Sequence, residues 1–336
     1  MPERIGARTI NLPNRPVITA SAGVVGKKES EGPLGGEFDY IFDDTTAGEK
    51  TWEKAESMIH KEAIMRAKEK SGKDFEELQF IFAGDLLNQC TGSTFGLRDF
   101  GVPFAGIYGA CSTMALGLCM AGVFVDSGAA QACVASTSSH FCSAEKQFRF
   151  PVEYGSQRTP SAQWTVTGAG AAVVESQGEG VHIEKVCFGK IVDLGVTDAN
   201  NMGGAMAPAA ADTIAAFLED TQMNVGDLDM ILTGDLGTIG SSLLCDMLLN
   251  DKGIDIRDKH YDCGVMIYDS VEQDVHSGGS GCGCSGSVLC SHIMKRMNSG
   301  ELKRVLFTAT GALMSPVSSM QGESIPSIAH AVLLVK

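Results

Sequence analysis

The residue types best suited to chemistry gather around Cys111. This cysteine stands in "YGACSTMALGL" (Tyr108 to Leu118), after two small residues and before an apolar run that continues to Val125. The pattern predicts a thiol at the first turn of a buried helix, where the positive end of the helix dipole lowers the pKa of a thiol. A packed core cysteine would give the same pattern. The segment therefore leaves three interpretations open: a nucleophile, a relic of a nucleophile, or a core residue.

A second group of candidates follows a predicted strand, in "ASTSSHFCSAEKQFRFPVEYGSQR" from Ala135 onward. Serines at a strand end lie where α/β sheets present ligands, arginine forks suit carboxylates, and phenylalanines stack on aromatic rings. The polar candidates are Ser136, Ser138, His140, Arg149 and Arg158. The alternatives are that the serines satisfy turn backbone, that Arg149 pairs with Glu153, and that the aromatic residues pack in a dimer.

Composition and charge limit the class of protein. The chain has 336 residues, of which 44% are hydrophobic and 20% charged, and this balance predicts a globular protein. A net charge of -15 argues against binding to nucleic acid or to an anionic membrane surface. Eleven irregularly spaced cysteines and an N-terminus without an apolar signal sequence predict reduced thiols in a soluble chain of cytoplasmic type.

Two segments invite other interpretations. Residues 100–125 carry no charge and are long enough to span a bilayer. Their glycines and Pro103 instead predict a short strand from Phe104 to Tyr108 and a helix from Cys111. The other segment offers metal-ligand types without any standard zinc spacing, namely Cys282, Cys284, Cys290 and His292. We therefore expect neither a metal nor a cofactor.

The chain contains an internal repeat. The segments "DFEELQFIFAGDLL", from Asp74, and "VGDLDMILTGDLG", from Val225, share a polar lead, an apolar strand and Gly-Asp-Leu. A predicted helix precedes each of them, over Trp52 to Lys70 and over Ala209 to Asp220. Further along, "ACSTMALGLCMAGVFVDSG" and "GCSGSVLCSHIMKRMNSG" each predict a Cys-Ser-led helix that is followed by a strand.

This repeat sets the domain organisation. Alternation of strands and helices in each half predicts parallel sheets with helical crossovers. We divide the chain into an N-terminal half, residues 1–175, and a C-terminal half, residues 176–336. An insertion near residues 139–165 has no counterpart in the second half, and long insertions of this kind usually carry function or build an interface.

Three motifs resemble the thiolase-like superfamily of thiolases and ketoacyl synthases. They are the nucleophile motif "GACSTMALGL", the glycine-rich strand "TVTGAGAAVV" and the glycine-rich turn "GSGCGCSGS", in this order. The resemblance implies an α/β, thiolase-like fold, in which two repeated βαβ-rich halves form a layered α/β/α/β/α sandwich. It also implies a homodimer formed through a strand that continues the sheet across the two-fold axis. By the logic of the repeat, that strand is Gln131 to Thr137.

A closer resemblance is to the stage V sporulation protein AD family of spore-forming Firmicutes. It is carried by "AGDLLNQ", "EGPLGG", "AMAPAAADTI", "DCGVMIYD", "ATGALMSP" and "ESIPSIAHAV". The resemblance implies a role in moving dipicolinic acid, pyridine-2,6-dicarboxylate, into the developing spore and out at germination. It implies binding of dipicolinic acid alone or as its calcium chelate. It further implies partners among the spore inner-membrane proteins of the same operon, and a peripheral place at that membrane.

Within this resemblance Cys111 occupies the nucleophile position, but its proton-handling partners are replaced. Ser280 stands where the thiolase turn has a histidine, and Asp235 or its neighbour Gly234 stands where a second catalytic histidine would be. An aspartate beside a thiol raises the pKa of the thiol by like-charge repulsion. Two other histidines could take over the proton handling of the missing ones. His330 either enters the pocket or packs near the sheet end. His276 is expected to be a loop residue.

We therefore expect a non-catalytic binding protein for dipicolinic acid. The alternatives are a Cys111-dependent acyltransferase or condensing enzyme, and a structural docking subunit of a spore membrane complex. The ligand site is expected at the start of the Cys111 helix, between the two halves, with the amides of Cys111 and Ser112 facing the ligand. The insertion is expected to form one wall. The predicted ligand-binding residues are Cys111, Ser112, Ser136, Ser138, His140, Arg149, Asp235, Ser280 and His330.

Overall fold

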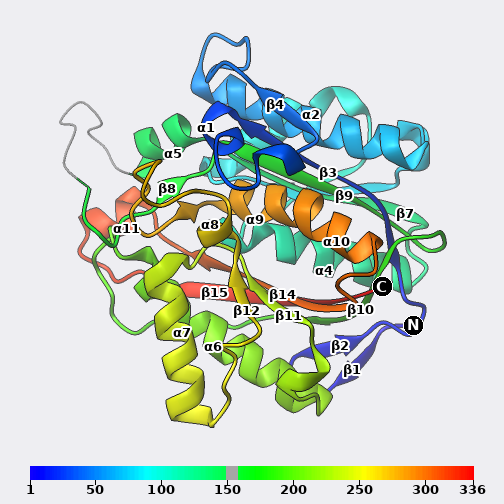
Figure 1. The fold of residues 1–336 in the computed structure, drawn as a ribbon. Coiled ribbons are helices and arrows are strands. Elements are labelled where there is room, and N and C mark those ends of the chain that lie inside the picture. Colours follow the sequence, from blue (N-terminus) through cyan, green and yellow to red (C-terminus); the bar gives the residue numbers. More distant parts are fainter. Residues whose placement is uncertain (149–157) are drawn as a thin grey trace.

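Two layers of mixed β-sheet, one from each half of the chain, form the frame of the molecule (Figure 1). A short antiparallel pairing, Val181 opposite Ile18 and His182 opposite Val17, joins them into one continuous sheet. The computed structural model describes residues 1–148 and 158–336. The main strands of the N-terminal half are β3 (Val17–Gly26), β5 (Phe80–Gly84), β6 (Phe104–Gly106), β7 (Ala132–Ser139) and β9 (Gly168–Glu175). They lie in the order β6-β5-β7-β9-β3, and β9 runs antiparallel to both of its neighbours.

The C-terminal half repeats this arrangement. Its strands are β10 (Val181–Cys187), β11 (Met230–Thr233), β12 (His260–Asp262), β14 (Arg304–Ala312) and β15 (Ser327–Val335). They lie in the order β12-β11-β14-β15-β10, which is the same sequence of third, second, fourth, fifth and first strand. β15 again runs antiparallel to its neighbours. The prediction of purely parallel sheets is therefore wrong, because one strand in each half reverses direction.

Helices form three layers around these sheets, as Figure 1 shows. One outer layer holds α2 (Trp52–Ser71), and the other holds α6 (Met202–Thr221) and α7 (Gly237–Lys252). Between the sheets lie α4 (Thr113–Asp126) and α9 (Cys282–Val288), which continues through a π-helical turn, Leu289–Ile293, into α10 (Met294–Asn298). The predicted α/β/α/β/α sandwich is thus confirmed.

Helix α4 is apolar on nearly every side because strands of both halves cover it. In α4 the side chains of Met114, Leu118 and Cys119 are fully buried and belong to a core that includes strands of both halves. The uncharged run of residues 100–125 is divided between β6 and α4, as predicted. Among the described helices, none is long and apolar enough to cross a membrane.

Shorter elements complete the fold. They are β1 (Glu3–Ile5), β2 (Thr9–Asn11), α1 (Lys27–Ser30), β4 (Tyr40–Phe42), α3 (Thr91–Leu97), α5 (Phe141–Phe148), β8 (Trp164–Thr165), α8 (Cys263–Met266), β13 (Gly279–Ser280) and α11 (Pro316–Met320). Of these, β8 pairs with β13, Trp164 opposite Gly279 and Thr165 opposite Ser280. This small sheet ties the end of the insertion to the glycine-rich turn of the C-terminal half.

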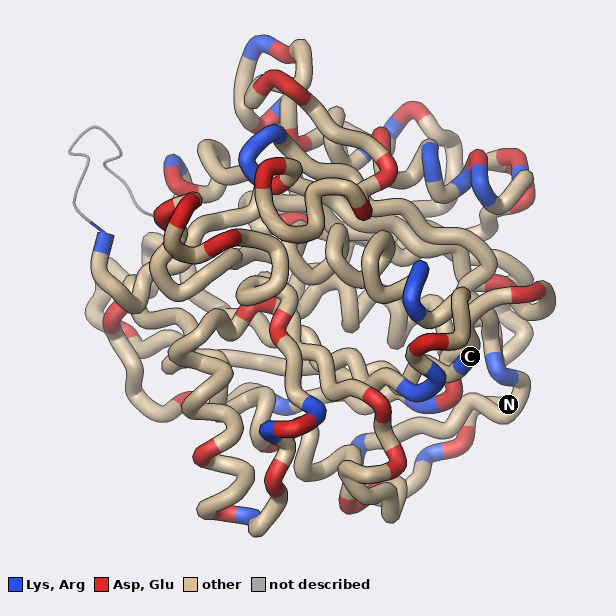
Figure 2. Tube along the Cα trace, in the orientation of Figure 1, with Lys and Arg blue, Asp and Glu red and all other residues tan. Residues whose placement is uncertain are grey.

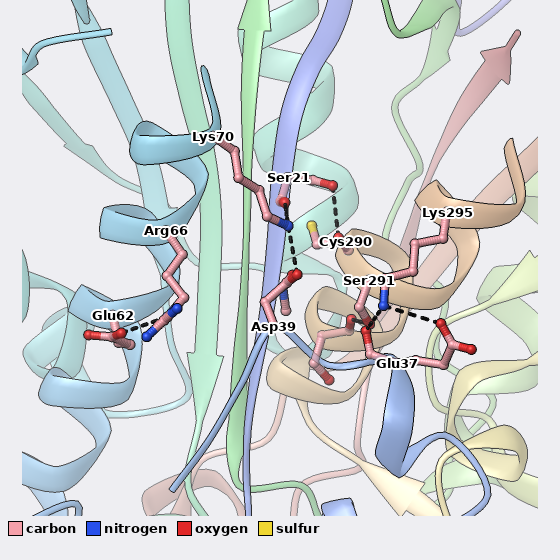
Figure 3. Close-up of polar contacts among 11 residues, drawn as sticks. Ser21, Glu37, Asp39, Glu62, Arg66, Lys70, Cys290, Ser291 and Lys295 are labelled. Atoms are coloured by element: carbon pink, nitrogen blue, oxygen red, sulfur yellow. Dashed lines mark hydrogen bonds and ion pairs between the residues drawn. The ribbon is translucent and has the colours of Figure 1, made fainter. Parts of the chain in front are cut away.

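Polar contacts fasten the outer helix α2 to the sheet and to the central layer (Figure 3). The Lys70 ammonium donates to the Ser21 carbonyl at 2.8 Å and pairs with Asp39 at 2.6 Å. The Ser21 hydroxyl donates to the Cys290 carbonyl at 2.8 Å on the opposite face of β3. One short segment of β3 therefore connects two helical layers.

Charge is distributed unevenly between the surface and the interior. Figure 2 shows the charged residues mainly along outer helices and loops, with few in the central layer. Among the described residues, the buried Asp and Glu side chains are Glu29, Glu56, Asp85, Asp126, Asp235 and Asp262, and no Lys or Arg is buried. Burying a carboxylate without a cation is costly, so each of these acids must either gather hydrogen-bond donors or stay protonated.

The strand predicted to form the dimer is a central strand of its sheet. β7 pairs with β5 along one side and with β9 along the other. Both edges of residues 131–137 are therefore used, and that strand cannot continue the sheet into a second molecule. The open edge of the N-terminal sheet is β6, which among the described strands pairs with β5 alone. Phe104 in this strand is 39% exposed, and Tyr108, two residues beyond its end, is 45% exposed.

Candidate ligand-binding site

A cavity opens beside Cys111, between the two halves of the chain. Its empty volume, with the open solvent at the mouth included, is about 460 Å³. It is lined by Leu86, Tyr108, Ala110, Cys111, Ala144, Glu145, Phe148, Thr165, Met202, Ser280, Ala312 and Met314. The walls are mostly apolar, with a few hydroxyl groups, one thiol and one carboxyl group.

The turn that carries Cys111 is locked against the C-terminal half. Ala110–Ser112 forms a 3-10 turn at the start of α4, and Ala110 has a φ of +48°. Gly311 of β14 lies so close that a Cβ there would come within 2.0 Å of the Gly109 carbonyl oxygen. This close approach places the Cys111 side chain at the junction of the two halves.

Ser112 does not face the cavity. Its amide donates to the Gly109 carbonyl at 3.0 Å, and its hydroxyl donates to the same oxygen at 2.6 Å. Both groups serve the turn itself, so the predicted role of the Ser112 amide as a ligand donor is wrong.

Asp235 lies directly behind Cys111 and Ser280. Its Oδ2 accepts the Gly281 amide at 2.7 Å and the Ser280 hydroxyl at 3.3 Å. Its Oδ1 is buried without a hydrogen-bond partner of good geometry among the described residues, although the neighbouring Cys111 thiol acts on the carboxyl as a weak donor. The structure thus brings Cys111, Asp235 and Ser280 together, as the sequence analysis expected.

The protonation of this group follows from its burial. Burial raises the pKa of Asp235 to about 7, and the nearby Asp262 adds to the increase. Burial, followed by the negative charge of Asp235, holds the pKa of the Cys111 thiol well above its usual value. These effects outweigh the helix dipole, so Cys111 is a neutral thiol at pH 7.

Two residues hold the loop that presents Asp235. The side-chain amide of Gln163, from the insertion, donates to the carbonyls of Asp235 at 2.7 Å and Gly279 at 2.8 Å. The Asp262 carboxylate accepts the amides of Leu236 at 2.8 Å and Gly237 at 3.0 Å. The Asp235 loop and the glycine-rich turn are therefore fixed with respect to each other.

Ser136 and Ser138 point away from the cavity. Their hydroxyls contact the His60 ring of α2, Ser136 at Nε2 (2.9 Å) and Ser138 at Nδ1 (3.1 Å), and Ser138 also reaches Glu56 at 3.4 Å. Burial lowers the pKa of His60 to about 3, so the ring is neutral. The two serines belong to a buried polar cluster between α2 and β7, and the structure does not bring them to the ligand site.

The predicted histidines also lie outside the cavity lining. His140 contacts the Thr45 carbonyl at 2.7 Å through Nε2 and accepts the Cys142 amide at Nδ1. His330 accepts the Gly189 amide at 3.3 Å, lies edge-on to Phe188, and has a pKa lowered to about 4 by burial. The structure therefore gives His330 the packing role. His276 is a loop residue that contacts Thr159 and Asp274.

Of the two predicted arginines, the structure describes Arg158 but not Arg149. Arg158 lies over the Trp164 ring, 4.6 Å from its centroid, and beside Asp274, and it does not line the cavity. Arg149 lies outside the described residues, so its role as a fork for a carboxylate stays a prediction.

The described part of the insertion does form one wall of the cavity. Ala144, Glu145 and Phe148 of α5 line it. Ser143 on the same helix donates to Glu56 of α2 at 2.5 Å. This contact ties the wall to the outer helix.

Several lining residues escaped the sequence analysis. Tyr108 belongs to the quoted Cys111 motif, and Thr165 opens a quoted glycine-rich strand, so a signal existed for both. Leu86, Met202 and Met314 come from loop ends and a helix start, where single apolar residues carry no distinguishing pattern.

Comparison with known proteins identifies the family. The family model described as stage V sporulation protein AD (SpoVAD) matches residues 6–335 of the chain. The chain belongs to the stage V sporulation protein AD family. The protein of that name from Bacillus subtilis strain 168 is 44% identical over 319 residues, covering 95% of this chain and 94% of the relative. A role in sporulation follows from this membership.

Solved structures give the fold of this stage V sporulation protein AD family member. The 3-oxoacyl-[acyl-carrier-protein] synthase III of Aquifex aeolicus VF5 is 14% identical, with a TM-score of 0.58 over 96% of this chain and 100% of that one. A single-residue variant of OleA from Xanthomonas campestris is 12% identical, with a TM-score of 0.62 over 99% and 100%. These similarities show a thiolase-like fold over nearly the whole chain.

Proposed function

We propose that this member of the stage V sporulation protein AD family is a non-catalytic binding protein for dipicolinic acid, acting in its uptake into the developing spore and its release at germination. One observation carries the proposal. The Cys111 cavity is preserved between the two halves, while the groups behind the thiol are the Asp235 carboxyl and the Ser280 hydroxyl, where the resembled enzymes place imidazoles.

The chemistry of these groups supports binding more than turnover. Condensation through a cysteine requires a thiolate, a group that handles the proton or carboxylate at the α-carbon, and donors for an oxyanion. Here the pKa of the thiol is raised, and no histidine is among the described residues that line the cavity. An acyltransferase that uses Cys111 is therefore the weaker candidate.

The cavity walls suit a small aromatic acid. Phe148, Met202 and Met314 offer apolar and aromatic surface for a flat ring. Ser280 and Thr165 offer hydroxyl groups for a carboxyl group. Arg149 is expected to add a charged fork from the insertion, so Arg149→Ala should weaken binding about tenfold or more.

The assembly is part of the same proposal. The chain acts as a homodimer, joined through the open edge of β6 in place of residues 131–137. It associates peripherally with the spore inner membrane through other membrane proteins of the same operon. Dipicolinic acid is bound alone or as its calcium chelate.

Two assays on the purified full-length chain test this function. Calorimetric titration with sodium dipicolinate at pH 6.5, with and without calcium, should give saturable binding of one ligand per chain. Incubation with acyl-CoA thioesters should give no condensation or thiolytic cleavage above background. Turnover that disappears in Cys111→Ala would contradict the proposal, whereas slow acylation of Cys111 without turnover would be consistent with it.

A further inference from the structure

The two oxygens of the Asp235 carboxyl group have different surroundings. Oδ2 receives the Gly281 amide and the Ser280 hydroxyl, whereas Oδ1 is buried with no hydrogen-bond partner of good geometry among the described residues. A fully ionised carboxylate would normally collect donors on both oxygens. Apart from the Cys111 thiol, which is a weak donor to this carboxyl group, nothing occupies Oδ1 among the described residues, so a carboxylic acid could carry its own proton there.

The surroundings of Asp235 contain acids and thiols. Five titratable groups interact electrostatically with Asp235. They are Cys111 from the helix turn, Cys282 and Cys284 from α9, Asp262 from β12 and Cys263 from α8. Among the described residues that line the adjoining cavity, there is no Lys, Arg or His. The described part of the site therefore lacks a positive charge with which to balance an anion.

We infer that the site, when Asp235 is ionised, takes up one proton with each molecule of an aromatic carboxylate ligand that it binds, and that Asp235 holds this proton on Oδ1. The inference rests on the proposed function, because it concerns the same cavity and the same class of ligand. Asp235 acts here as a positioning residue behind the two lining residues Cys111 and Ser280, which the ligand contacts.

The two protonation states of Asp235 present different cavities to the ligand. When ionised, the carboxylate places a negative charge behind Cys111 and Ser280, and this charge repels a ligand carboxylate. It also accepts hydrogen bonds from the Cys111 thiol and the Ser280 hydroxyl, so both donors point away from the ligand. When protonated, the group is neutral and Oδ1 becomes a donor. Oδ2 then loses its negative charge and becomes a weaker acceptor, so the Ser280 hydroxyl and the Cys111 thiol can turn more readily to donate into the cavity. The proton comes from solvent, and no bond other than hydrogen bonds changes.

The pH dependence has a definite sign. The pKa of Asp235 is raised to about 7 by burial, whereas that of Asp262 is raised to about 6 and those of the four thiols lie above their usual value. Below pH 7 Asp235 is already protonated, and affinity should change little. Above pH 7 each unit should weaken binding by about tenfold, because one proton must be supplied from a tenfold lower concentration.

The experiment is a calorimetric titration of the full chain with sodium dipicolinate from pH 6.0 to 8.5, in pairs of buffers with different ionisation enthalpies. We expect uptake approaching one proton per ligand at pH 8, and a dissociation constant that rises about tenfold per unit above pH 7. Binding that is equally tight at all pH values, without proton uptake, would overturn this inference and leave the proposed function standing. Absence of binding at every pH would overturn both.

Two variants locate the proton. Asp235→Asn keeps an acceptor for the Gly281 amide and places a non-titrating donor at Oδ1, so it should bind at pH 8 as at pH 6. Asp193→Asn makes the same change of charge on an exposed loop and should retain the tenfold slope. A slope that survives in Asp235→Asn would overturn the assignment to Asp235.

A spectroscopic measurement on the parent chain tests the protonation of Asp235 without relying on a correctly folded Asp235→Asn variant. In infrared difference spectra at pH 8 with carboxyl-labelled aspartate, adding dipicolinate should produce the C=O band of a protonated aspartic acid. No such band would overturn the inference.

Discussion

At the scale of single residues, Cys111 has the position of a nucleophile without its reactivity. Its helix turn favours a thiolate, but complete burial and the Asp235 carboxylate act in the opposite direction and prevail. The groups around a cysteine thus determine the reactivity of its thiol as much as its position at the start of a helix does.

Alkylation of Cys111 should therefore be slow at neutral pH and rise only in alkaline solution. Asp235→Asn removes the like charge and should move the alkylation profile of Cys111 to lower pH by about one unit. Peptide mapping by mass spectrometry after timed iodoacetamide pulses separates Cys111 from the other ten cysteines. Half-maximal alkylation of the parent below pH 8 would contradict this account.

The sequence allowed some of these residues to be predicted and not others. Cys111, Asp235 and Ser280 were found because short motifs and the repeat placed them at equivalent ends of strands and turns. Ser136 and Ser138 were misplaced, because alternation in a strand covered on both faces does not tell which helical layer a polar residue faces. His60, their actual partner, stands 76 and 78 residues earlier in the chain, and no local pattern links the two segments.

At the scale of elements, the central layer depends on close approach of backbones. Gly170 of β9 and Gly286 of α9 lie so near that a Cβ on Gly170 would come within 2.1 Å of the Gly286 carbonyl oxygen. The helix that carries the glycine-rich turn of the site is therefore packed directly onto the N-terminal sheet.

Gly170→Ala should lower the free energy of unfolding by about 1–3 kcal/mol or more, because the obstacle is backbone and cannot move aside. Urea denaturation measures the change. Gly226→Ala is the matched control, since Gly226 has open space at its Cβ position, and its effect should stay within about 0.5 kcal/mol. Equal midpoints for Gly170→Ala and the parent would show that the two elements are not so closely packed.

The positions of helices along the chain were easier to predict than the directions of strands in the sheet. The helix Trp52 to Lys70 was expected and ends one residue later, because strong local signals mark it. The second expected helix, Ala209 to Asp220, begins earlier at Met202, where the Asn201 side chain caps it by accepting the Gly204 amide. The antiparallel course of β9 and β15 was missed, because a buried strand has the same apolar composition in either direction.

At the scale of the whole molecule, the repeat explains both the fold and the location of the cavity. Each half contributes five main strands in the same order to one continuous sheet, and the central helices lie between the two layers that these strands form. The cavity draws its walls from both halves and from the insertion that only the first half has.

The free edge of β6 predicts the quaternary structure. An exposed strand edge with partly exposed apolar side chains is a pairing surface, so the chain should sediment at twice the 35.4 kDa mass of one copy. Phe104→Glu should yield monomers that keep the parent's thermal stability. Val271→Glu, at an exposed apolar residue outside β6, should remain dimeric. A monomeric parent at micromolar concentration would rule out this interface.

The central claim is that the cavity beside Cys111 is a binding site for dipicolinate. The most direct measurement compares calorimetric titrations of the parent, Cys111→Ser and Cys111→Phe at pH 6.5, with dimer content and thermal stability checked for each. The account predicts that the parent and Cys111→Ser bind one dipicolinate per chain, and that the ring of Cys111→Phe fills the cavity and abolishes binding. A Cys111→Phe chain that binds dipicolinate as tightly as the parent would contradict the account.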